Sequence, residues 1–322
     1  MFVGNLPLAL AVNTPQDSSM YQTLLVPLDG SDFSARAIPV ASELARRTGA
    51  ALHVVLVNDP SAYIPFVPGE VAVPAYDADL VQQRRAEDQA VLDRTVEALR
   101  QAGRQVTGVL LEGTVVESLI EYGQQVAAEL TVMTTHGRGG FERLRLGSVA
   151  TALLARSTTP VLLVRDEPPV DGSALPTGPV LCPLDGSEFA ERMLPHAARL
   201  AEACGSVLRL FSVTTPHAIS MAPFATEALL ADPAVLVEEE HSRSDHLSHL
   251  LPQCPPGTTV HSVTDMSAGS AIVQEATACG AGFIAMATHG RSGLARLVLG
   301  SVADEVIRHA HLPMLVYRPG AR

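Results

Sequence analysis

The chain has 322 residues, 47% of them hydrophobic and 17% charged, which is enough apolar material for a large core and too little charge for a disordered chain. Its 34 acidic and 22 basic residues give a net charge of -12, and aromatic residues make up 4% with no Trp, so general nucleic-acid binding is not expected. Every basic residue is Arg, and the absence of Lys excludes a Lys-dependent P-loop, a Schiff-base lysine and a pyridoxal site.

Two stretches of the sequence recur, and this recurrence indicates how the chain is divided. TLLVPLDGS near the start returns as PVLCPLDGS, and THGRGGFERLRLGSVA returns as THGRSGLARLVLGSVA. Between the copies, 166–178 is rich in Pro, Gly and Asp and is predicted to be a linker. We therefore predict an N-terminal extension at 1–20, a first domain at 21–165 and a second at 179–319.

The N-terminal extension has an apolar stretch but no basic region before it, and no segment of the chain has the ~18 consecutive apolar residues that span a bilayer. We expect either a flexible extension before Tyr21 or a true start at Met20, and no membrane association. The cysteines form no C-x-x-C motif and have no His partners at zinc-like spacing, so we expect them to be reduced and the protein to be cytoplasmic. They are Cys182, Cys204, Cys254 and Cys279.

In both copies short apolar runs alternate with longer amphipathic stretches, which is typical of buried parallel strands joined by helices. Each copy is predicted to be a doubly wound, Rossmann-like α/β domain with a five-stranded parallel sheet and a ligand crevice at the carboxyl ends of its strands. The predicted strands are 23–28, 52–57, 106–111, 130–134 and 161–164 in the first copy, and 180–184, 207–213, 259–264, 283–288 and 314–317 in the second.

The first helix of each copy is predicted to cover the sheet with one apolar face. The last strand of each copy is expected at a sheet edge, so we predict that 161–164 and 314–317 pair antiparallel and make the chain a pseudo-dimer. Further association into a homodimer stays open. The predicted apolar faces contain Phe33, Ala37, Val40, Ala41 and Leu44 in the first copy, and Phe189, Met193, Ala197, Leu200 and Ala201 in the second.

The segment after the fourth predicted strand carries the strongest chemical signal: Thr-His-Gly, nine residues, and then Gly-Ser at the head of a helix. This arrangement directs unpaired backbone N–H groups and the positive helix end toward one point, which suits a phosphate. Alternatively, the Gly only makes a tight turn and the Ser is only an N-cap. The candidate residues are Gly137, Arg138, Gly147, Ser148 and Val149 in the first copy, and Gly290, Arg291, Gly300, Ser301 and Val302 in the second.

Arginines flank these loops and can compensate an anionic ligand in a chain of net charge -12. For Arg143, Arg145 and Arg296 a solvated loop face is an equal alternative.

An aspartate ends the first predicted strand of each copy, Asp29 in one and Asp185 in the other. There its carboxylate can accept hydrogen bonds from ribose hydroxyls or help to hold a metal ion on phosphates. An ordinary turn or cap is the alternative, since Asp-Gly-Ser is strong turn chemistry. Because the motif and the downstream loop occur together in both copies, we favour a shared site.

The histidines are not predicted to be catalytic or metal-binding. His136 and His289 at the strand ends lack a recurring nucleophile and orienting carboxylate, so a loop-fixing role is favoured. His246 and His249, at i and i+3 beside His241, are interpreted as part of a polar helix face. No catalytic residue and no protein metal ligand is predicted.

These motifs resemble the universal stress protein family in its tandem form, over about residues 20–319. In ATP-binding members the loop runs Gly, two residues, Gly, nine residues, then Gly followed by Ser or Thr, and both copies match it from the second Gly onward. Thr134 and Ala287 stand where the family has its first Gly. Because Ala is smaller than β-branched Thr, the second copy is expected to be the better site.

The resemblance implies an adenine-nucleotide α-hydrolase-like fold that binds ATP, with Mg2+. It also implies that Asp29 and Asp185 contact the adenosine moiety and that Val57 and Val213 line the adenine pocket. We therefore expect an ATP-binding regulatory protein of the stress response with little or no turnover and an unidentified regulatory protein partner.

Two alternatives remain: a dimerising interaction protein with empty crevices, and a slow ATPase. The divergent, Pro-rich segments 59–77 and 214–232 are hypothesised to select the partner.

Overall fold

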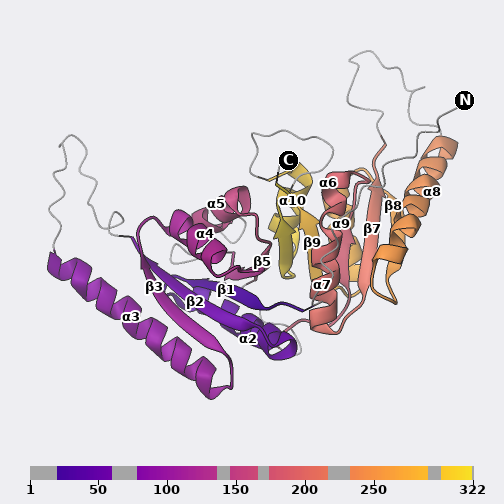
Figure 1. The fold of residues 1–322 in the computed structure, drawn as a ribbon. Helices are drawn as coiled ribbons and strands as arrows, with labels where there is room; N and C mark the ends of the chain where they lie inside the picture. Colours follow the sequence, from indigo (N-terminus) through magenta and orange to yellow (C-terminus); the bar gives the residue numbers. More distant parts are fainter. Residues whose placement is uncertain are drawn as a thin grey trace, which may run out of the picture.

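The computed structural model describes residues 20–59, 78–135, 146–165, 174–216, 233–288 and 299–320. Its centre is one ten-stranded sheet with the strand order β3-β2-β1-β4-β5-β10-β9-β6-β7-β8 (Figure 1). The strands are β1 Thr23–Leu28, β2 Ala51–Asn58, β3 Val106–Glu112, β4 Leu130–Thr134, β5 Val161–Val164, β6 Val180–Pro183, β7 Leu208–Thr214, β8 Thr259–Thr264, β9 Phe283–Ala287 and β10 Met314–Tyr317.

All ten predicted strands are present, and each end lies within one residue of its predicted position. Their apolar runs are long enough for a strand and too short for a buried helix, and both faces of the inner strands are buried. Within each repeat the strands are parallel, and the order reverses between β1 and β4 and again between β6 and β9. That reversal is where an open α/β sheet places its ligand crevice.

The two repeats share the sheet through their last strands. β5 and β10 pair antiparallel, with Val161 opposite Val316 and Leu163 opposite Met314. The predicted pairing of these two strands is therefore confirmed, and it joins the two parallel halves into a single sheet. Pairing also removes the two inner edges that a separate repeat would expose to other chains.

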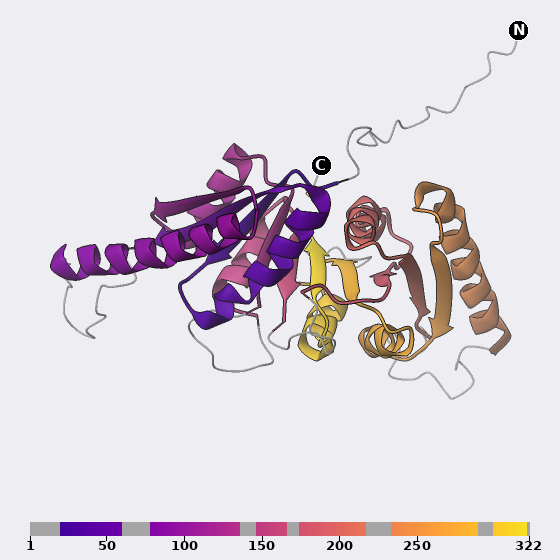
Figure 2. The same cartoon turned by 90° about the horizontal axis from the view of Figure 1, so that it is seen from below.

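The helices cover both faces of the sheet. Apolar residues of α2, α3, α7 and α8 pack on one face, and those of α4, α5, α9 and α10 pack on the other. At the junction α2 contacts α7 (Figure 2), whereas α3 and α8 lie at opposite ends of the molecule (Figure 1). The helices are α1 Asp32–Ala35, α2 Ala37–Thr48, α3 Ala78–Gln101, α4 Val115–Gln125, α5 Ser148–Arg156, α6 Glu188–Glu191, α7 Leu194–Cys204, α8 Pro233–Leu250, α9 Ala268–Ala278 and α10 Ser301–His309.

The prediction of one continuous first helix in each repeat is wrong. The structure has a single turn, α1 or α6, followed by a separate helix, α2 or α7. The short helices end at Ala35 and Glu191. Pro39 and Pro195, four residues further on, lack the N–H that would bond to the carbonyls of these two residues.

The break also rotates the first turn of each repeat. Phe33 and Phe189 are therefore half-buried, and Ser34 and Ala190 take the buried positions of the short helices. The remaining residues of the two predicted apolar faces are buried as expected. No described helix combines the length and the apolar character needed to cross a membrane.

Candidate functional site

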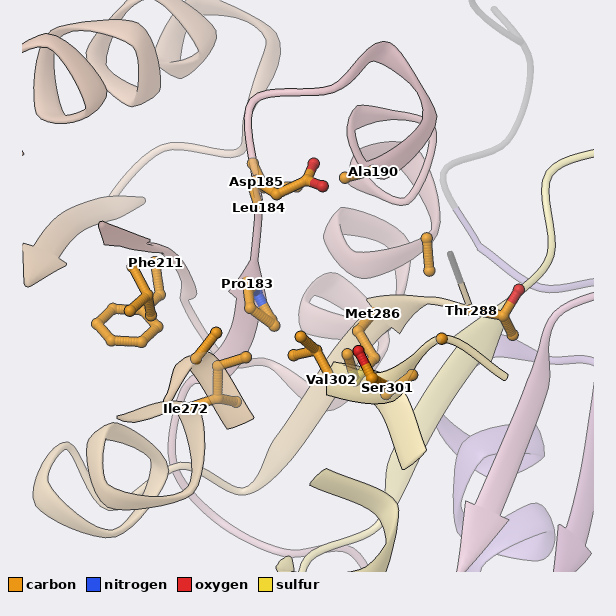
Figure 3. Close-up of a pocket in the computed structure, with 15 residues that line it drawn as sticks. Pro183, Leu184, Asp185, Ala190, Phe211, Ile272, Met286, Thr288, Ser301 and Val302 are labelled. Carbon is orange, nitrogen blue, oxygen red and sulfur yellow. The ribbon is translucent and has the colours of Figure 1, made fainter. Parts of the chain in front are cut away.

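A cavity of about 270 Å³ opens at the carboxyl ends of the strands of repeat two (Figure 3). It lies at the reversal point of the strand order, because the ends of β6 and β9 both line it. Asp185 follows β6, Ala287 ends β9 and is followed by Thr288, and the first residues of α10 close another side. Elements far apart in the chain thus meet at one pocket, as the recurrence of both motifs predicted.

The head of α10 presents uncapped backbone amides to this cavity. Gly300 is the N-cap and provides no side-chain hydrogen bond, and its own N–H donates to the carbonyl of Thr288 at 2.6 Å. The next three residues, Ser301, Val302 and Ala303, all line the cavity. Within the described part of the chain their backbone N–H groups have no acceptor, as is usual for the first turn of a helix that lacks a side-chain cap.

Other helices of the same molecule are capped by serine, which makes the difference at α10 informative. Ser31, Ser187 and Ser267 accept from the backbone N–H of the residue three positions on, at 3.2, 3.1 and 3.2 Å. At α10 and at its counterpart α5 the capping residue is Gly300 or Gly147, and the serine is the first residue of the helix. The alternative that Ser148 and Ser301 are N-caps is therefore wrong.

The Asp185 carboxylate has a local structural role and also lines the cavity. Its Oδ1 accepts from the backbone N–H of Ser187 at 3.0 Å and from the Ser187 hydroxyl at 2.6 Å. These bonds hold the turn that leads into α6, so the turn chemistry considered for Asp-Gly-Ser is present. In Figure 3 the carboxylate points toward Ala190, which also lines the pocket. One side chain therefore both holds the turn and lines the cavity.

Repeat one has the same local architecture. Asp29 Oδ1 accepts from the Ser31 N–H at 2.9 Å and from its hydroxyl at 2.5 Å, and the Gly147 N–H donates to the Thr135 carbonyl at 2.8 Å. One difference is Ser34, whose hydroxyl accepts from the Asp29 N–H at 3.2 Å, where repeat two has the smaller Ala190. Ala190 has no hydroxyl for a matching bond to the Asp185 N–H.

The remaining predicted residues fall into two groups. Val213 on β7 lines the cavity of repeat two, and Val57 occupies the same place on β2, half-buried against the α4 and α5 side. Val149 follows Ser148 in the first turn of α5. The other predicted loop residues and the loop histidines lie outside the described residues: Gly137, Arg138, Gly290, Arg291, Arg143, Arg145, Arg296, His136 and His289.

Several apolar residues of the pocket were not predicted, among them Phe211, Ile272 and Met286. Phe211 is completely buried, and its ring packs against that of His261 with the centroids 5.7 Å apart. In the sequence these residues look like ordinary strand and helix core, so no pattern distinguishes them. They give the pocket a largely apolar wall.

Within the described ranges no group of three His, Cys, Asp or Glu side chains comes together in a way that could hold a metal ion. His246 Nε2 lies 2.8 Å from Glu191 Oε1, and His249 Nδ1 lies 2.7 Å from the Asp245 carbonyl, both exposed on α8. The interpretation as a polar helix face agrees with these contacts.

All four cysteines are free. Burial raises the pKa of each thiol, that of Cys204 to about 12. Because the thiolate is the reactive form, these side chains are suited to packing rather than to chemistry.

Comparison with known proteins decides the family. A sequence model of the universal stress protein family matches residues 20–165 and 177–318. The chain belongs to the universal stress protein family. A universal stress protein of Mycobacterium tuberculosis is 29% identical over 302 residues, which cover 92% of this chain and 96% of the relative.

Other universal stress proteins match one half or the fold alone. One from Thermus aquaticus is 34% identical over 152 residues, 45% of this chain and all of the relative. The crystal structure of one from Archaeoglobus fulgidus superimposes with a TM-score of 0.65 at 19% identity, covering 94% of this chain and 99% of that one. The tandem α/β fold of this universal stress protein is therefore shared along nearly its whole length.

Proposed function

We propose that repeat two binds an adenine nucleotide, ATP, and that its occupancy regulates a protein partner in the stress response with little or no turnover. The observation that carries the proposal is the convergence of three uncapped amides of α10 with the Asp185 carboxylate on one cavity. The two ends of that cavity differ in chemistry, as the two ends of a nucleotide do.

The head of α10 suits the phosphates. Backbone N–H groups of Ser301, Val302 and Ala303 lie at the positive end of the helix, and an anion held there satisfies donors that have no acceptor among the described residues. Gly300 has φ -65° and ψ 154°, which any residue adopts. The benefit of glycine at this position is therefore the lack of a side chain between the helix head and a ligand.

The opposite part of the cavity suits a nucleoside. Phe211, Val213 and Ile272 form an apolar wall against which a flat base can pack, and Asp185 stands where a carboxylate can accept from ribose hydroxyls. The choice of adenine rests on the resemblance of the loops to ATP-binding members of the family.

A Mg2+ ion fits this site only as part of the nucleotide. Asp185 is the single carboxylate among the described residues that line the cavity, and one of its oxygens already accepts from Ser187. A bound Mg2+ would supply charge compensation to the phosphates, with most of its ligands from phosphate oxygens and water.

The proposal of little or no turnover rests on the sequence, in which no nucleophile with an orienting carboxylate recurs near the loop histidines. A regulatory role is the function that this site supports best. A cytoplasmic location, consistent with the four free cysteines, is part of the proposal.

Isothermal titration of the full chain with ATP and Mg2+ tests the proposal. We expect saturable binding that Asp185→Ala weakens by about tenfold or more, because a charge-assisted hydrogen bond is lost. Gly300→Val should weaken it similarly by placing a branched side chain at the helix head. The matched variants Asp29→Ala and Gly147→Val leave the binding of repeat two unchanged.

Two outcomes would overturn parts of the proposal. Absence of saturable binding at millimolar ATP would leave the dimerising interaction protein as the better account. Mg2+-dependent phosphate release that Asp185→Ala abolishes would establish an ATPase instead of a protein with little or no turnover.

A further inference from the structure

We propose that Glu305 is a positioning residue of the repeat-two site, which fixes the first turn of α9 against α10 and thereby sets the shape of the cavity. This inference rests on the proposed nucleotide site. It assigns a role to a residue that neither the motif nor the cavity lining includes.

Glu305 lies on α10, one turn beyond the residues that line the cavity, and reaches across to the start of α9. Its Oε1 accepts from the Ser267 hydroxyl at 2.9 Å and from the Ser270 hydroxyl at 3.4 Å. Ser267 is the N-cap of α9, and its Oγ in turn accepts from the Ser270 N–H at 3.2 Å. The carboxylate thus stands at the positive end of α9, where a negative charge is favourable.

Gly269 provides the space that this contact needs. A Cβ on Gly269 would lie less than 3.0 Å from Cγ, Cδ and Oε2 of Glu305, closer than Cβ atoms approach other groups in proteins. Because Glu305 lies directly over the Gly269 backbone, even an alanine there would displace its carboxylate. The close approach and the hydrogen bonds together define one preferred separation of the two helices.

Repeat one solves the same packing differently. Ala152 is the fifth residue after Gly147, as Glu305 is the fifth after Gly300, and Val116 is the second after the cap of α4, as Gly269 is the second after the cap of α9. In repeat two the large residue is on α10 and the small one on α9. In repeat one the small residue is on α5 and the larger one on α4. Repeat one instead links α4 and α5 by an exposed ion pair between Glu117 and Arg156.

The contact matters for the site because both helices contribute to the cavity. Ala268 and Ile272 come from α9, and the amides of Ser301 to Ala303 come from α10. A shift of α9 would move the apolar wall relative to the amides, so a nucleotide could no longer contact both at their best distances. Such geometric effects of supporting residues are expected in a preorganised site.

A double-mutant cycle tests the inference. ATP titrations of the full chain compare wild type with Glu305→Ala, Glu305→Gln, Gly269→Ala and the Glu305→Ala/Gly269→Ala double variant. The δ1-methyl NMR signal of Ile272 serves as a local readout of the repeat-two cavity. Arg156→Ala, which breaks the exposed pair of repeat one, is the matched control.

We expect Glu305→Ala and Gly269→Ala each to weaken ATP binding by about fivefold or more, and Glu305→Gln to stay within about twofold because it keeps an acceptor for the Ser267 hydroxyl. In the double variant Gly269→Ala should add nothing, because it acts by displacing Glu305. Arg156→Ala should not change the affinity of the repeat-two cavity.

Unchanged affinity in Glu305→Ala, or additive losses in the double variant, would overturn the positioning role. Loss of binding in Glu305→Gln equal to that in Glu305→Ala would show that the charge, and not the geometry, is what counts, and would also overturn it. The wild-type titration in the same series separates these results from a failure of the proposed function, which would abolish binding in every sample.

Discussion

Arg199 of repeat two and Glu129 of repeat one form an ion pair across the junction, with Nη2 of the arginine 2.8 Å from Oε1 of the glutamate. The same Nη2 donates to the Met20 carbonyl at 2.7 Å, and the guanidinium lies over the Tyr21 ring, 4.5 Å from its centroid. Glu129 Oε2 accepts from the Gln22 N–H at 2.5 Å. Arg199 and Glu129 therefore connect α7 to the segments that lead into β1 and β4.

Because this cluster is mostly shielded from water, we expect Arg199→Met to lower the free energy of unfolding by about 1–3 kcal/mol. Urea denaturation followed by circular dichroism measures the change. Arg308→Met, which removes an exposed pair with Asp304, should cost no more than about 0.5 kcal/mol. Equal losses in the two variants would contradict a special role for Arg199.

His196 predicts a pH dependence of stability. Burial, with a smaller contribution from Arg199, lowers the pKa of His196 to about 4, and its ring packs on that of Tyr317 with the centroids 4.3 Å apart. The His196 side chain takes up a proton near pH 6.5 in the unfolded chain and only near pH 4 in the folded protein. The contribution of neutral His196 to the free energy of unfolding is therefore complete above pH 6.5 and is lost as the pH falls from 6.5 to 4.

We expect wild type to lose on the order of 2 kcal/mol more than His196→Gln between pH 7 and pH 4. Denaturation midpoints measured at half-unit steps of pH provide the comparison. Carboxylates titrate in both proteins and cancel in the difference. Parallel pH profiles would show that His196 is protonated as readily in the folded protein as in the unfolded chain.

Ala287 tests the departure from the family loop. This residue ends β9 and lines the cavity, so Ala287→Val adds two methyl groups to the space proposed for the nucleotide. We expect a loss of ATP affinity of about tenfold or more, whereas Ala287→Gly should bind at least as tightly as wild type. Thr134→Ala in repeat one is the control, and titrations followed by the Ile272 methyl signal report on repeat two. Tight binding by Ala287→Val would place the ligand elsewhere.

The seam between β5 and β10 predicts how separated repeats behave. Residues 20–165 and 174–320, produced together as two chains, should form a one-to-one complex, because each has a buried edge strand that pairs with the other. Each piece alone should self-associate through the same edge. Size-exclusion chromatography with light scattering distinguishes these species, and two stable monomers in the mixture would contradict the prediction.

The architecture was predictable because its signals are local and occur twice. A run such as 130–134 has the length and composition of a strand buried on both faces, and its counterpart at 283–287 carries the same signal. The pairing of β5 with β10 followed from their position at the end of each repeat. The break before α2 was also encoded locally, by Pro39, but the apolar periodicity that runs through it concealed the effect.

The candidate site was predictable only in part. Asp185 and the Gly300-Ser301 pair belong to short motifs, and the strand order brings them together. Phe211 and Glu305 belong to no motif, because one looks like core and the other like the polar face of a helix. Their positions depend on how α9 packs against β7 and α10, and contacts between segments so far apart in the chain leave no periodic trace in the sequence.

The antiparallel pairing of β5 with β10 determines at which margin of the sheet the strands of each repeat end. Since β5 and β10 run in opposite directions, the carboxyl ends of the two sets of strands face opposite margins of the shared sheet. The carboxyl ends of β1 and β4 therefore lie at the margin of the sheet opposite to the repeat-two cavity. A protein that docks over the repeat-two cavity would therefore lie at the far margin of the sheet from the strand ends of repeat one.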